Sequence, residues 1–540
     1  MAMDGTMMDF PLTLTPMLER AGKLFPEVEI VTRLPDKSLH RHSFADFHRR
    51  ATELASALEA AGLKRGERVA TIMWNSYAHL EIYFGVPCSG GVLHTLNFRL
   101  HENDIAFIAN HAEDRFLIVD DVLLPIYEKI KDKVSFERVF VVPLSGAPIP
   151  DGLENYEDFL ASGPDGYSFP ELDENAACGM CYTSGTTGKP KGVAYSHRAM
   201  VLHTFCAGLP DIVGLSQCDV VLPVVPMFHA NAWGLAYLAV MVGSKIAFPG
   251  PHMDADSLLE LCEAEQVTLA AGVPTIWIGI LQALENDASR WKLHPDFRTV
   301  VGGSALPESM IRDFDKHGIT TIHAWGMTEL TPLGTLSRLK RGMEGMSEDA
   351  RYDVRAKQGM PVPYVEARVV DDNGEAPWDG KSMGEFQVRG PWVAANYYNS
   401  EEGQDKWTDD GWFGTGDVVT MDAEGYVKIT DRTKDLIKSG GEWISSVDLE
   451  NALMGHASVR EAAVIAVAHE KWTERPLAVI VAAEGADVNA ASLNDFLSQN
   501  FAKWWLPDAY EVVEEIPRTS TGKFLKTALR EKFADRYAGQ

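Results

Sequence analysis

The sequence predicts an α/β protein of two or more structural units, with sheets that are at least partly parallel. Short apolar runs of strand length alternate with segments of helical spacing, which is typical of βαβ units. Glycine-rich turns follow several of these runs, as they do where parallel strands open into ligand sites. The chain has 540 residues, more than one hydrophobic core usually supports.

The alternation can be followed from the N-terminus. Beginning at Phe44, apolar residues recur at helical spacing, notably Leu54, Leu58 and Ala61. Further helices are expected over 78–86 and 197–209. The expected strands cover 68–73, 92–95, 116–120, 139–143, 176–182, 245–248, 269–273 and 299–301, and another begins at Thr320.

Composition limits the classes of partner. The chain is 46% hydrophobic and 23% charged, and its 77 acidic against 49 basic residues give a net charge of −28. This charge disfavours a nucleic acid or an anionic membrane surface as the main partner. No stretch approaches the roughly 18–20 apolar residues of a membrane-spanning helix, and the first residues lack the basic start of a secretory signal. We therefore expect a cytoplasmic protein without an integral membrane segment.

Six cysteines are too few for a disulfide framework in a chain of this length. Cys178 and Cys181 form the one close pair, with a spacing that also occurs in redox and zinc motifs. No second pair or histidine cluster accompanies them. Because both lie in an apolar expected strand, we predict that they are small core residues.

The segment YTSGTTGKPKG, residues 182–192, has the composition of a phosphate-binding loop. Its glycines allow a tight turn in which backbone N–H groups converge on an anion. It is not a Walker A loop, because Pro190 stands where that motif needs a hydroxyl residue after Lys189. The candidate phosphate ligands are Thr183, Ser184, Gly185, Thr186, Thr187, Gly188 and Lys189.

Two later turns carry candidate site residues. If a helix begins near Ala230, His229 and Trp233 lie about one turn apart and face one cavity. A wall of a carbon-chain pocket and a packed core turn both remain open for them. Glu329 is the lone acid of its segment. It suits Mg²⁺, which prefers oxygen ligands, and it equally suits the start of a helix, where an acid stabilises the free N–H groups.

Taken together, these motifs resemble the ATP-dependent adenylate-forming (ANL) superfamily, which holds acyl-CoA synthetases, peptide-synthetase adenylation domains and firefly luciferase. The resemblance rests on YTSGTTGKPKG (182–192), GMTE (326–329), TGD (415–417), DRTKD (431–435) and PRTSTGK (517–523). FHANAWG (228–234) and KSGGEWISS (438–446) resemble the fatty-acyl-CoA synthetase branch, including the bacterial 3-methylmercaptopropionate-CoA ligases.

The resemblance implies an AMP-forming acyl-CoA ligase with ATP and coenzyme A as co-substrates. A carboxylate attacks the α-phosphate of ATP, and the thiol of coenzyme A then displaces AMP, so the protein acts by positioning and electrostatics. Thr183 and Glu329 would anchor Mg²⁺. The contacts to adenine, ribose and α-phosphate fall on Gly303, Ser304, His323, Ala324, Trp325, Gly326, Met327, Thr328, Asp417, Arg432 and Lys434.

The resemblance also implies a catalytic Lys523 and a hinge at Asp431. By itself, one lysine near the chain end would equally be a solvated charge. The hinge divides a large N-terminal adenylation domain of several subdomains with mostly parallel sheets, residues 1–430, from a small mobile α+β domain, residues 431–540. Rotation would present Lys523 for adenylation and a second face for coenzyme A. That face carries Lys438, Gly440, Gly441 and Trp443, although two glycines also suit a buried β-turn.

The expected acid is short or medium in chain length, because two tryptophans shorten a pocket. A soft thioether tolerates aromatic walls, and butyrate or hexanoate would fit too, so the choice of 3-methylmercaptopropionate is what the resemblance to the 3-methylmercaptopropionate-CoA ligases implies. The alternatives are a medium- or long-chain fatty-acyl-CoA synthetase, an adenylate-forming enzyme with a non-CoA acceptor, and a non-catalytic member, which would be expected to lack Lys523 or Glu329. Likeness to the branch implies a homodimer. The candidate acid-binding residues are His229, Ala230, Trp233, Gly302, Trp325 and Pro332.

Overall fold

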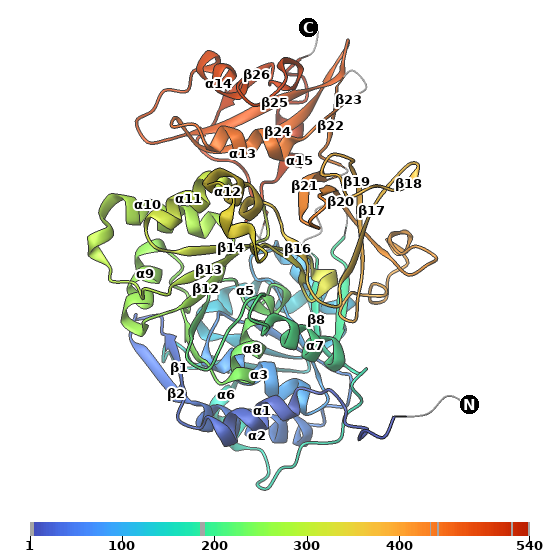
Figure 1. Ribbon diagram of the computed structural model, residues 1–540. Helices are drawn as coiled ribbons and strands as arrows, with labels where there is room; N and C mark the ends of the chain where they lie inside the picture. Colours follow the sequence, from blue (N-terminus) through green and yellow to red (C-terminus); the bar gives the residue numbers. More distant parts are fainter. Residues whose placement is uncertain (1–4, 184–188, 433, 440–441, 520–521, 538–540) are drawn as a thin grey trace.

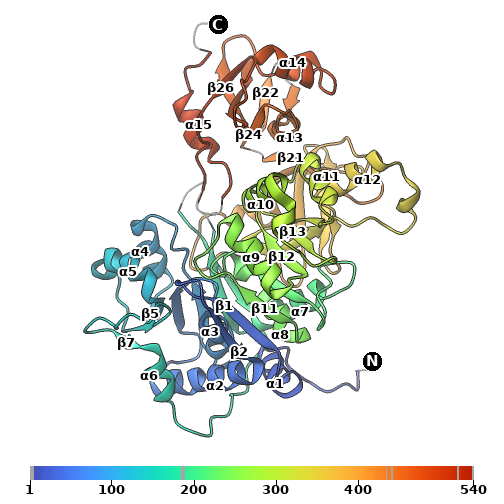
Figure 2. The ribbon, with the colours of Figure 1, turned by 90° about the vertical axis from the view of Figure 1, so that its left-hand side faces the viewer.

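The computed structural model describes residues 5–183, 189–432, 434–439, 442–519 and 522–537. Within these residues the strands form four sheets. The sheet of the C-terminal unit lies above the other three in Figure 1. Figure 2 shows the helices α4 (Glu102–His111) and α5 (Leu124–Ile130) at the left, and α9 (Ala255–Glu265), α10 (Pro274–Asp287) and α11 (Glu308–Lys316) from the centre to the upper right. None of the helices in the described part of the chain has the length and apolarity needed to cross a bilayer.

The first sheet is parallel except at its last pair, and it has the order β7-β6-β5-β3-β4-β8-β9. Side chains alternate between its faces, as they must in a strand. Phe116 and Ile118 of β5 pack on one side, whereas Leu117 and Val119 pack on the other with α4. Its strands are β3 (Arg68–Ile72), β4 (Val92–Thr95), β5 (Asp114–Asp120), β6 (Arg138–Val142), β7 (Glu154–Asn155), β8 (Ala177–Tyr182) and β9 (Gly192–Ser196).

The second sheet has the order β16-β15-β14-β13-β12-β10-β11-β1-β2 and is parallel from β14 to β1. It therefore takes its hairpin β1–β2 from the start of the chain. Its strands are β1 (Glu29–Arg33), β2 (Leu39–Ser43), β10 (Val220–Pro223), β11 (Lys245–Phe248), β12 (Leu269–Gly272), β13 (Arg298–Val301), β14 (Thr320–Gly326), β15 (Leu333–Leu336) and β16 (Met360–Pro361).

The buried helix α3 (Tyr77–Cys88) joins the first two sheets, and the apolar helix α8 (Leu235–Val242) covers the second. Every residue of α3 is buried, and α3 packs against β4 and β8 of the first sheet and β1 of the second. The helix α8 packs against β10 and β11. A helix that is apolar around its whole circumference has to be covered on all sides. Other helices close the outer faces: α1 (Thr15–Leu24), α2 (Phe44–Ala60), α6 (Tyr156–Ala161), α7 (His197–Ala207) and α12 (Glu348–Ala356).

The third sheet is antiparallel and was not predicted as such from the sequence. It has the order β18-β17-β19-β20-β21, with β17 (Glu366–Asp371), β18 (Gly374–Glu375), β19 (Gly384–Arg389), β20 (Phe413–Met421) and β21 (Val427–Arg432). The C-terminal unit then forms a mixed sheet with helices beside it. It contains β22 (Ile437–Ser439), β23 (Glu442–Ile444), β24 (Val459–His469), β25 (Thr473–Ala482), β26 (Ala509–Val512), α13 (Ser446–Met454), α14 (Ala490–Leu497) and α15 (Lys526–Lys532).

The predicted α/β class, with a large N-terminal part and a smaller C-terminal unit, is confirmed, and the predicted strands match observed strands to within two residues. One prediction is wrong. No right-handed helix begins near Ala230, because residues 230–233 have positive φ and the helix α8 begins only at Leu235. The strand β21 also continues through Arg432, past the predicted end of the large domain. Cys178 and Cys181 are buried in β8, as predicted.

A buried ion pair fastens α2 to α3 beside the first sheet. The guanidinium of Arg50 donates to Glu81 at 2.7 Å and to Glu157 at 2.7 Å. The side chain of Glu81 is 1% exposed, whereas the neighbouring pair Arg49–Glu53 lies on the surface. Removing one partner of a buried pair costs far more than removing an exposed one, because the remaining charge stays out of water.

We expect Arg50→Ala to lower the free energy of unfolding by about 3 kcal/mol, since Glu81 loses its buried partner. The matched control Arg49→Ala removes an exposed i,i+4 pair and should cost only about 0.3–0.5 kcal/mol. Urea unfolding followed by circular dichroism compares the two variants. Equal midpoints for both would contradict this assignment of the buried pair.

Candidate active site

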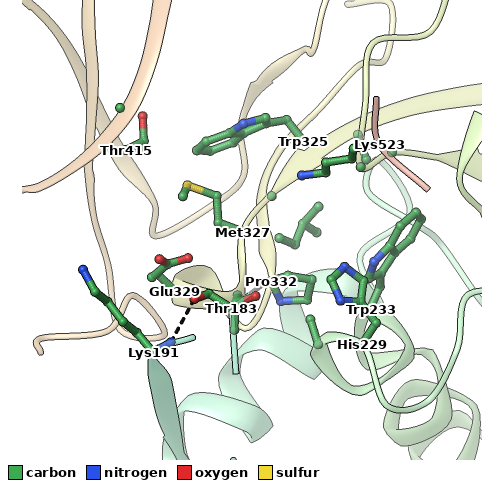
Figure 3. Close-up of a pocket in the computed structure, with 18 of the residues that line it drawn as sticks. Thr183, Lys191, His229, Trp233, Trp325, Met327, Glu329, Pro332, Thr415 and Lys523 are labelled. Carbon is green, nitrogen blue, oxygen red and sulfur yellow. Dashed lines mark hydrogen bonds between the residues drawn. The ribbon is translucent and has the colours of Figure 1, made fainter. Parts of the chain in front are cut away.

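The carboxyl ends of several parallel strands meet at one cavity of about 350 Å³ (Figure 3). Such edges are where α/β sheets bind ligands. Thr183 follows β8, Gly302 follows β13, and Met327 follows β14. Most of the predicted site residues line this cavity: Thr183, Lys189, His229, Ala230, Trp233, Gly302, Gly303, Ala324, Trp325, Gly326, Met327, Thr328, Glu329, Pro332, Arg432, Lys434 and Lys523. The predicted residues Ser184 to Gly188, Gly440 and Gly441 lie outside the described residues.

Two hydrogen bonds join Thr183, the residue after β8, to Lys191, the residue before β9. The backbone N–H of Lys191 donates to the Thr183 hydroxyl at 3.1 Å, and the N–H of Thr183 donates to the Lys191 carbonyl at 2.9 Å. Figure 3 shows Thr183 beside Glu329 at one end of the cavity. Among the described residues, the cavity is lined by the cations Lys189, Lys191, Lys406, Arg432, Lys434 and Lys523 and by one carboxylate, that of Glu329. Within an acidic chain, this concentration of positive charge suits a polyphosphate.

Glu329 is held in a defined orientation. Its side chain is buried in the three-residue 3-10 helix Thr328–Leu330, which no α-helix continues. The Tyr397 hydroxyl donates to its Oε1 at 2.6 Å, and the Tyr195 hydroxyl donates to the Thr328 carbonyl at 2.8 Å. The second carboxylate oxygen has no partner among the hydrogen bonds of the described residues, so Glu329 can offer it to a cation in the cavity.

Lys523 reaches the cavity from the C-terminal unit. Figure 3 shows its amine directed between Trp325 and the His229 side of the cavity. Burial and the positive charge of Arg432 lower the pKa of Lys523 to about 8, although the carboxylates of Asp417 and Glu329 act in the other direction. A pKa of about 8 leaves most of the amine protonated at pH 7. Lys523 is therefore not the solvated surface charge that the sequence left open as an alternative.

A second cavity of about 220 Å³ adjoins the first and is lined by the remaining predicted nucleotide residues, Ser304, His323 and Asp417. Asp417 is 3% exposed. Its carboxylate accepts the Trp325 indole N–H at 2.8 Å and is paired with the Arg432 guanidinium at 3.3 Å. Burial lowers the pKa of His323 to about 4, so that its ring is neutral. The two cavities share Trp325 and Lys523.

The wall with His229 and Trp233 has an unusual backbone. Residues 230–233 have φ values of 43°, 55°, 50° and 56°, a left-handed turn built without glycine. Each such L-residue costs about 1–2 kcal/mol, so the surrounding contacts have to hold the turn. A side chain at Gly302 would lie 3.5 Å from the Trp233 ring and 2.8 Å from the Ala324 carbonyl. The absence of a side chain there lets Trp233 lie against the backbone. Burial lowers the pKa of His229 to about 4, which keeps its ring neutral.

The sequence analysis missed several lining residues. Polar groups are added by Tyr397, Lys191 and Lys406. Of these three, only Lys191 could have been found from the sequence, because it follows Pro190 in the glycine-rich segment. The apolar part of the wall is formed by Ala207, Leu235, Ala271, Val300 and Leu333 with Val213. These are ordinary core residues by type, and only packing brings them to the cavity.

Lys438 and Trp443 are the predicted residues that the structure does not bring to the cavities. They lie on the hairpin β22–β23, where the Lys438 amine stands 5.3 Å from the centre of the Trp443 ring. Trp443 is 42% exposed. In this arrangement the C-terminal unit presents Lys523 to the cavity and leaves this hairpin at the surface.

Comparison with known proteins agrees with this geometry. The family model described as AMP-binding enzyme matches residues 18–398, and the model for the AMP-binding enzyme C-terminal domain matches residues 448–523. A long-chain-fatty-acid–CoA ligase of Thermus thermophilus is 50% identical, covering 100% of this chain and 98% of that protein. A 3-methylmercaptopropionyl-CoA ligase of Ruegeria pomeroyi is 45% identical, covering 99% of this chain and 100% of that protein.

The fold also matches solved structures. The crystal structure of an anthranilate CoA ligase, AuaEII, in complex with anthranoyl-AMP superimposes with a TM-score of 0.87 at 26% identity, covering 98% of this chain and 99% of that chain. The family models cover the two parts of the chain that meet at the cavity. The chain therefore belongs to the AMP-binding enzyme family of the ANL superfamily and is an ATP-dependent, AMP-forming acyl-CoA ligase.

Proposed function

We propose that this ligase activates a short- or medium-chain carboxylic acid, 3-methylmercaptopropionate above all, in the cavity between Trp233 and Glu329. The observation that carries the proposal is the position of Lys523. It comes from the C-terminal unit, yet it lines the same cavity as Thr183 and Glu329 of the N-terminal sheets. A cation, a hydroxyl and a carboxylate that are far apart in the sequence thus face one reaction space.

In this proposal, Thr183 with the loop to Lys189 holds the β- and γ-phosphates of ATP. Asp417 accepts the ribose hydroxyls, with Arg432 beside it, because a carboxylate takes two hydroxyl donors at once. This role of Asp417 is supported by the hydrogen bond that the Trp325 indole N–H donates to its Oδ2, because that bond fixes the carboxylate before any ligand arrives. The segment from Gly303 to Thr328 frames the adenine and the α-phosphate.

Thr183 and Glu329 would hold Mg²⁺ in this site. The donor set fits, since both side chains offer oxygen, and magnesium at nucleotide sites takes one or two protein ligands together with substrate phosphates. Tyr397 orients the carboxylate of Glu329 by donating to one of its oxygens. When bound, the ion would neutralise negative charge on the phosphates.

The first half-reaction joins a carboxylate oxygen of the acid to the α-phosphorus, and the bond from that phosphorus to the bridging oxygen of pyrophosphate breaks. Lys523 holds the α-phosphate and the carboxylate oxygen while negative charge moves between them. In the second half-reaction the sulfur of coenzyme A bonds to the acyl carbon. AMP leaves with the electron pair, and the thiol proton passes to solvent.

The boundary between the large domain, residues 1–430, and the small domain, residues 431–540, is part of the proposal, with Asp431 as hinge. In support, the Asp431 carboxylate accepts the backbone N–H of Ser446 at 2.7 Å, which links β21 to the start of α13. Rotation at this point would replace Lys523 by the hairpin with Lys438 and Trp443 and would admit coenzyme A along Gly440 and Gly441. The CoA ligases among the relatives favour coenzyme A over another acceptor.

One observation favours a second candidate, a medium- or long-chain acid. The cavity is walled in part by small or apolar side chains, among them Ala207 and Val213, and the T. thermophilus relative is named for long-chain acids. The R. pomeroyi relative supports the thioether acid. A homodimer, supported by likeness to the branch, and a cytoplasmic location, the default expectation from the sequence, complete the proposal. Light scattering of the purified protein would measure the assembly.

We expect Lys523→Ala to lower acid-dependent pyrophosphate release roughly 10²–10³-fold, because the charge that stabilises the transition state is lost. Thioester formation from preformed acyl-adenylate should fall much less. The control Lys532→Ala removes an exposed lysine of α15 and should leave both rates unchanged. Pyrophosphate release by Lys523→Ala at the parent rate would refute the role assigned to this amine.

The hinge is tested by Asp431→Pro, which restricts φ to about −65° and removes the carboxylate that holds the Ser446 N–H. Stopped-flow measurement of both half-reactions should show at least a tenfold loss in thioester formation relative to adenylation. Retention of full rate in both half-reactions would exclude rotation at this residue.

The acid is identified by kcat/KM for 3-methylmercaptopropionate, butyrate, hexanoate and decanoate with ATP and coenzyme A. We expect the thioether acid to rank first; decanoate in first place would establish the second candidate. Ala207→Phe fills the apolar part of the cavity, and each excluded methylene is worth about 0.8 kcal/mol. The ratio of decanoate to butyrate should therefore fall at least tenfold, and it should not change in Ala288→Phe, which alters an exposed alanine.

A further inference from the structure

The left-handed turn at residues 230–233 is held by a polar contact that reaches the first sheet. The Asn231 side chain is 1% exposed. Its Oδ1 accepts the thiol S–H of Cys181 at 3.0 Å, and its Nδ2 donates to the Tyr237 hydroxyl at 3.3 Å. Thus one end of the amide is tied to β8 and the other to α8. A buried amide with both ends bonded has a fixed orientation.

Cys181 lies in the strand that leads to the phosphate end of the cavity. It is two residues before Thr183, whose hydroxyl accepts the Lys191 N–H. Thr95 of β4 also contacts this thiol, since its hydroxyl lies 3.4 Å from the Cys181 sulfur. The same hydroxyl donates to the Phe228 carbonyl at 3.3 Å. The thiol therefore connects the strand that ends at Thr183 with the turn that carries His229 and Trp233.

We propose that Cys181 and Asn231 are positioning residues for adenylation, which set the distance between the acid-binding wall and the strand that carries the phosphate site. This rests on the proposed function, because it assigns the acid to the wall and the triphosphate to Thr183. In-line attack needs the carboxylate and the α-phosphate in one narrow geometry, and small displacements cost rate. A strained turn without such a tie would relax away from that geometry.

In this proposal the Cys181 thiol forms hydrogen bonds and takes no covalent part in the reaction. Burial raises the pKa of Cys181 above its ordinary value, so the sulfur keeps its proton at neutral pH. Cys178 provides the internal comparison. It lies on the same strand and is equally buried, but its thiol packs in the apolar core and makes no hydrogen bond to the turn among the described residues.

The test compares Cys181→Ala, Cys181→Ser and Cys178→Ala by acid KM, ATP KM and kcat of pyrophosphate release. Cys181→Ala should raise the acid KM at least fivefold and lower kcat. Cys181→Ser keeps a donor of similar size and should return both values to within about twofold of the parent. Cys178→Ala should lower the thermal midpoint and leave both KM values unchanged. If Cys181 had a purely structural role, Cys181→Ala would give this same result.

Asn231→Ala removes the same bond from the other side. The double variant Cys181→Ala/Asn231→Ala should be no worse in acid KM than Asn231→Ala alone, since the two changes share one interaction. Additive effects, or an acid KM in Cys181→Ala equal to that of the parent, would overturn the proposal. If Cys181→Ala does not fold, Cys181→Ser and Asn231→Ala decide it. A parent without acid-dependent pyrophosphate release would instead refute the proposed function.

Discussion

The packing of the two mainly parallel sheets against the buried helix α3 is the constraint on which the site depends. α3 is buried along its whole length and packs against strands of both sheets and against α2, whereas α8 packs against the second sheet and against α1 and α7. With the sheets held against α3, the carboxyl ends of β8, β13 and β14 face one cavity. The position of each chemical group then follows from the strand that carries it, which is why loops with different sequences can act together.

The charge that lines the cavity is opposite in sign to the net charge of the chain. The net charge is −28, yet six lysine and arginine side chains line the cavity with the carboxylate of Glu329. Collecting cations at one place has a cost that is visible at Lys523, where burial and Arg432 lower the pKa to about 8. An anionic ligand removes that cost, so the site is arranged for binding negative charge. The acidic remainder of the surface discourages other polyanions from competing.

Polar contacts across the site connect residues that are distant in the sequence. Tyr397 orients Glu329, Trp325 orients Asp417, and Cys181 orients Asn231. In each pair the partner is a buried or half-buried side chain that donates a hydrogen bond to an oxygen of the other residue. Such pairs hold a site in place without contacting the reacting atoms. They also explain how a left-handed turn without glycine can persist beside a reaction space.

The sequence by itself determined the α/β class, the positions of several strands in the two mainly parallel sheets, and the chemical groups in its motifs, such as Thr183, Glu329, Asp417 and Lys523, because hydrophobic period and residue type are local properties. Tertiary structure decided the rest. The backbone at Ala230 is left-handed because packing outweighs local preference, the third sheet is antiparallel because of how distant segments pair, and the apolar wall of Ala207 and Val213 is made of ordinary core residues. Contacts between distant segments depend on the free energy of the whole fold, and no window of the sequence contains that quantity.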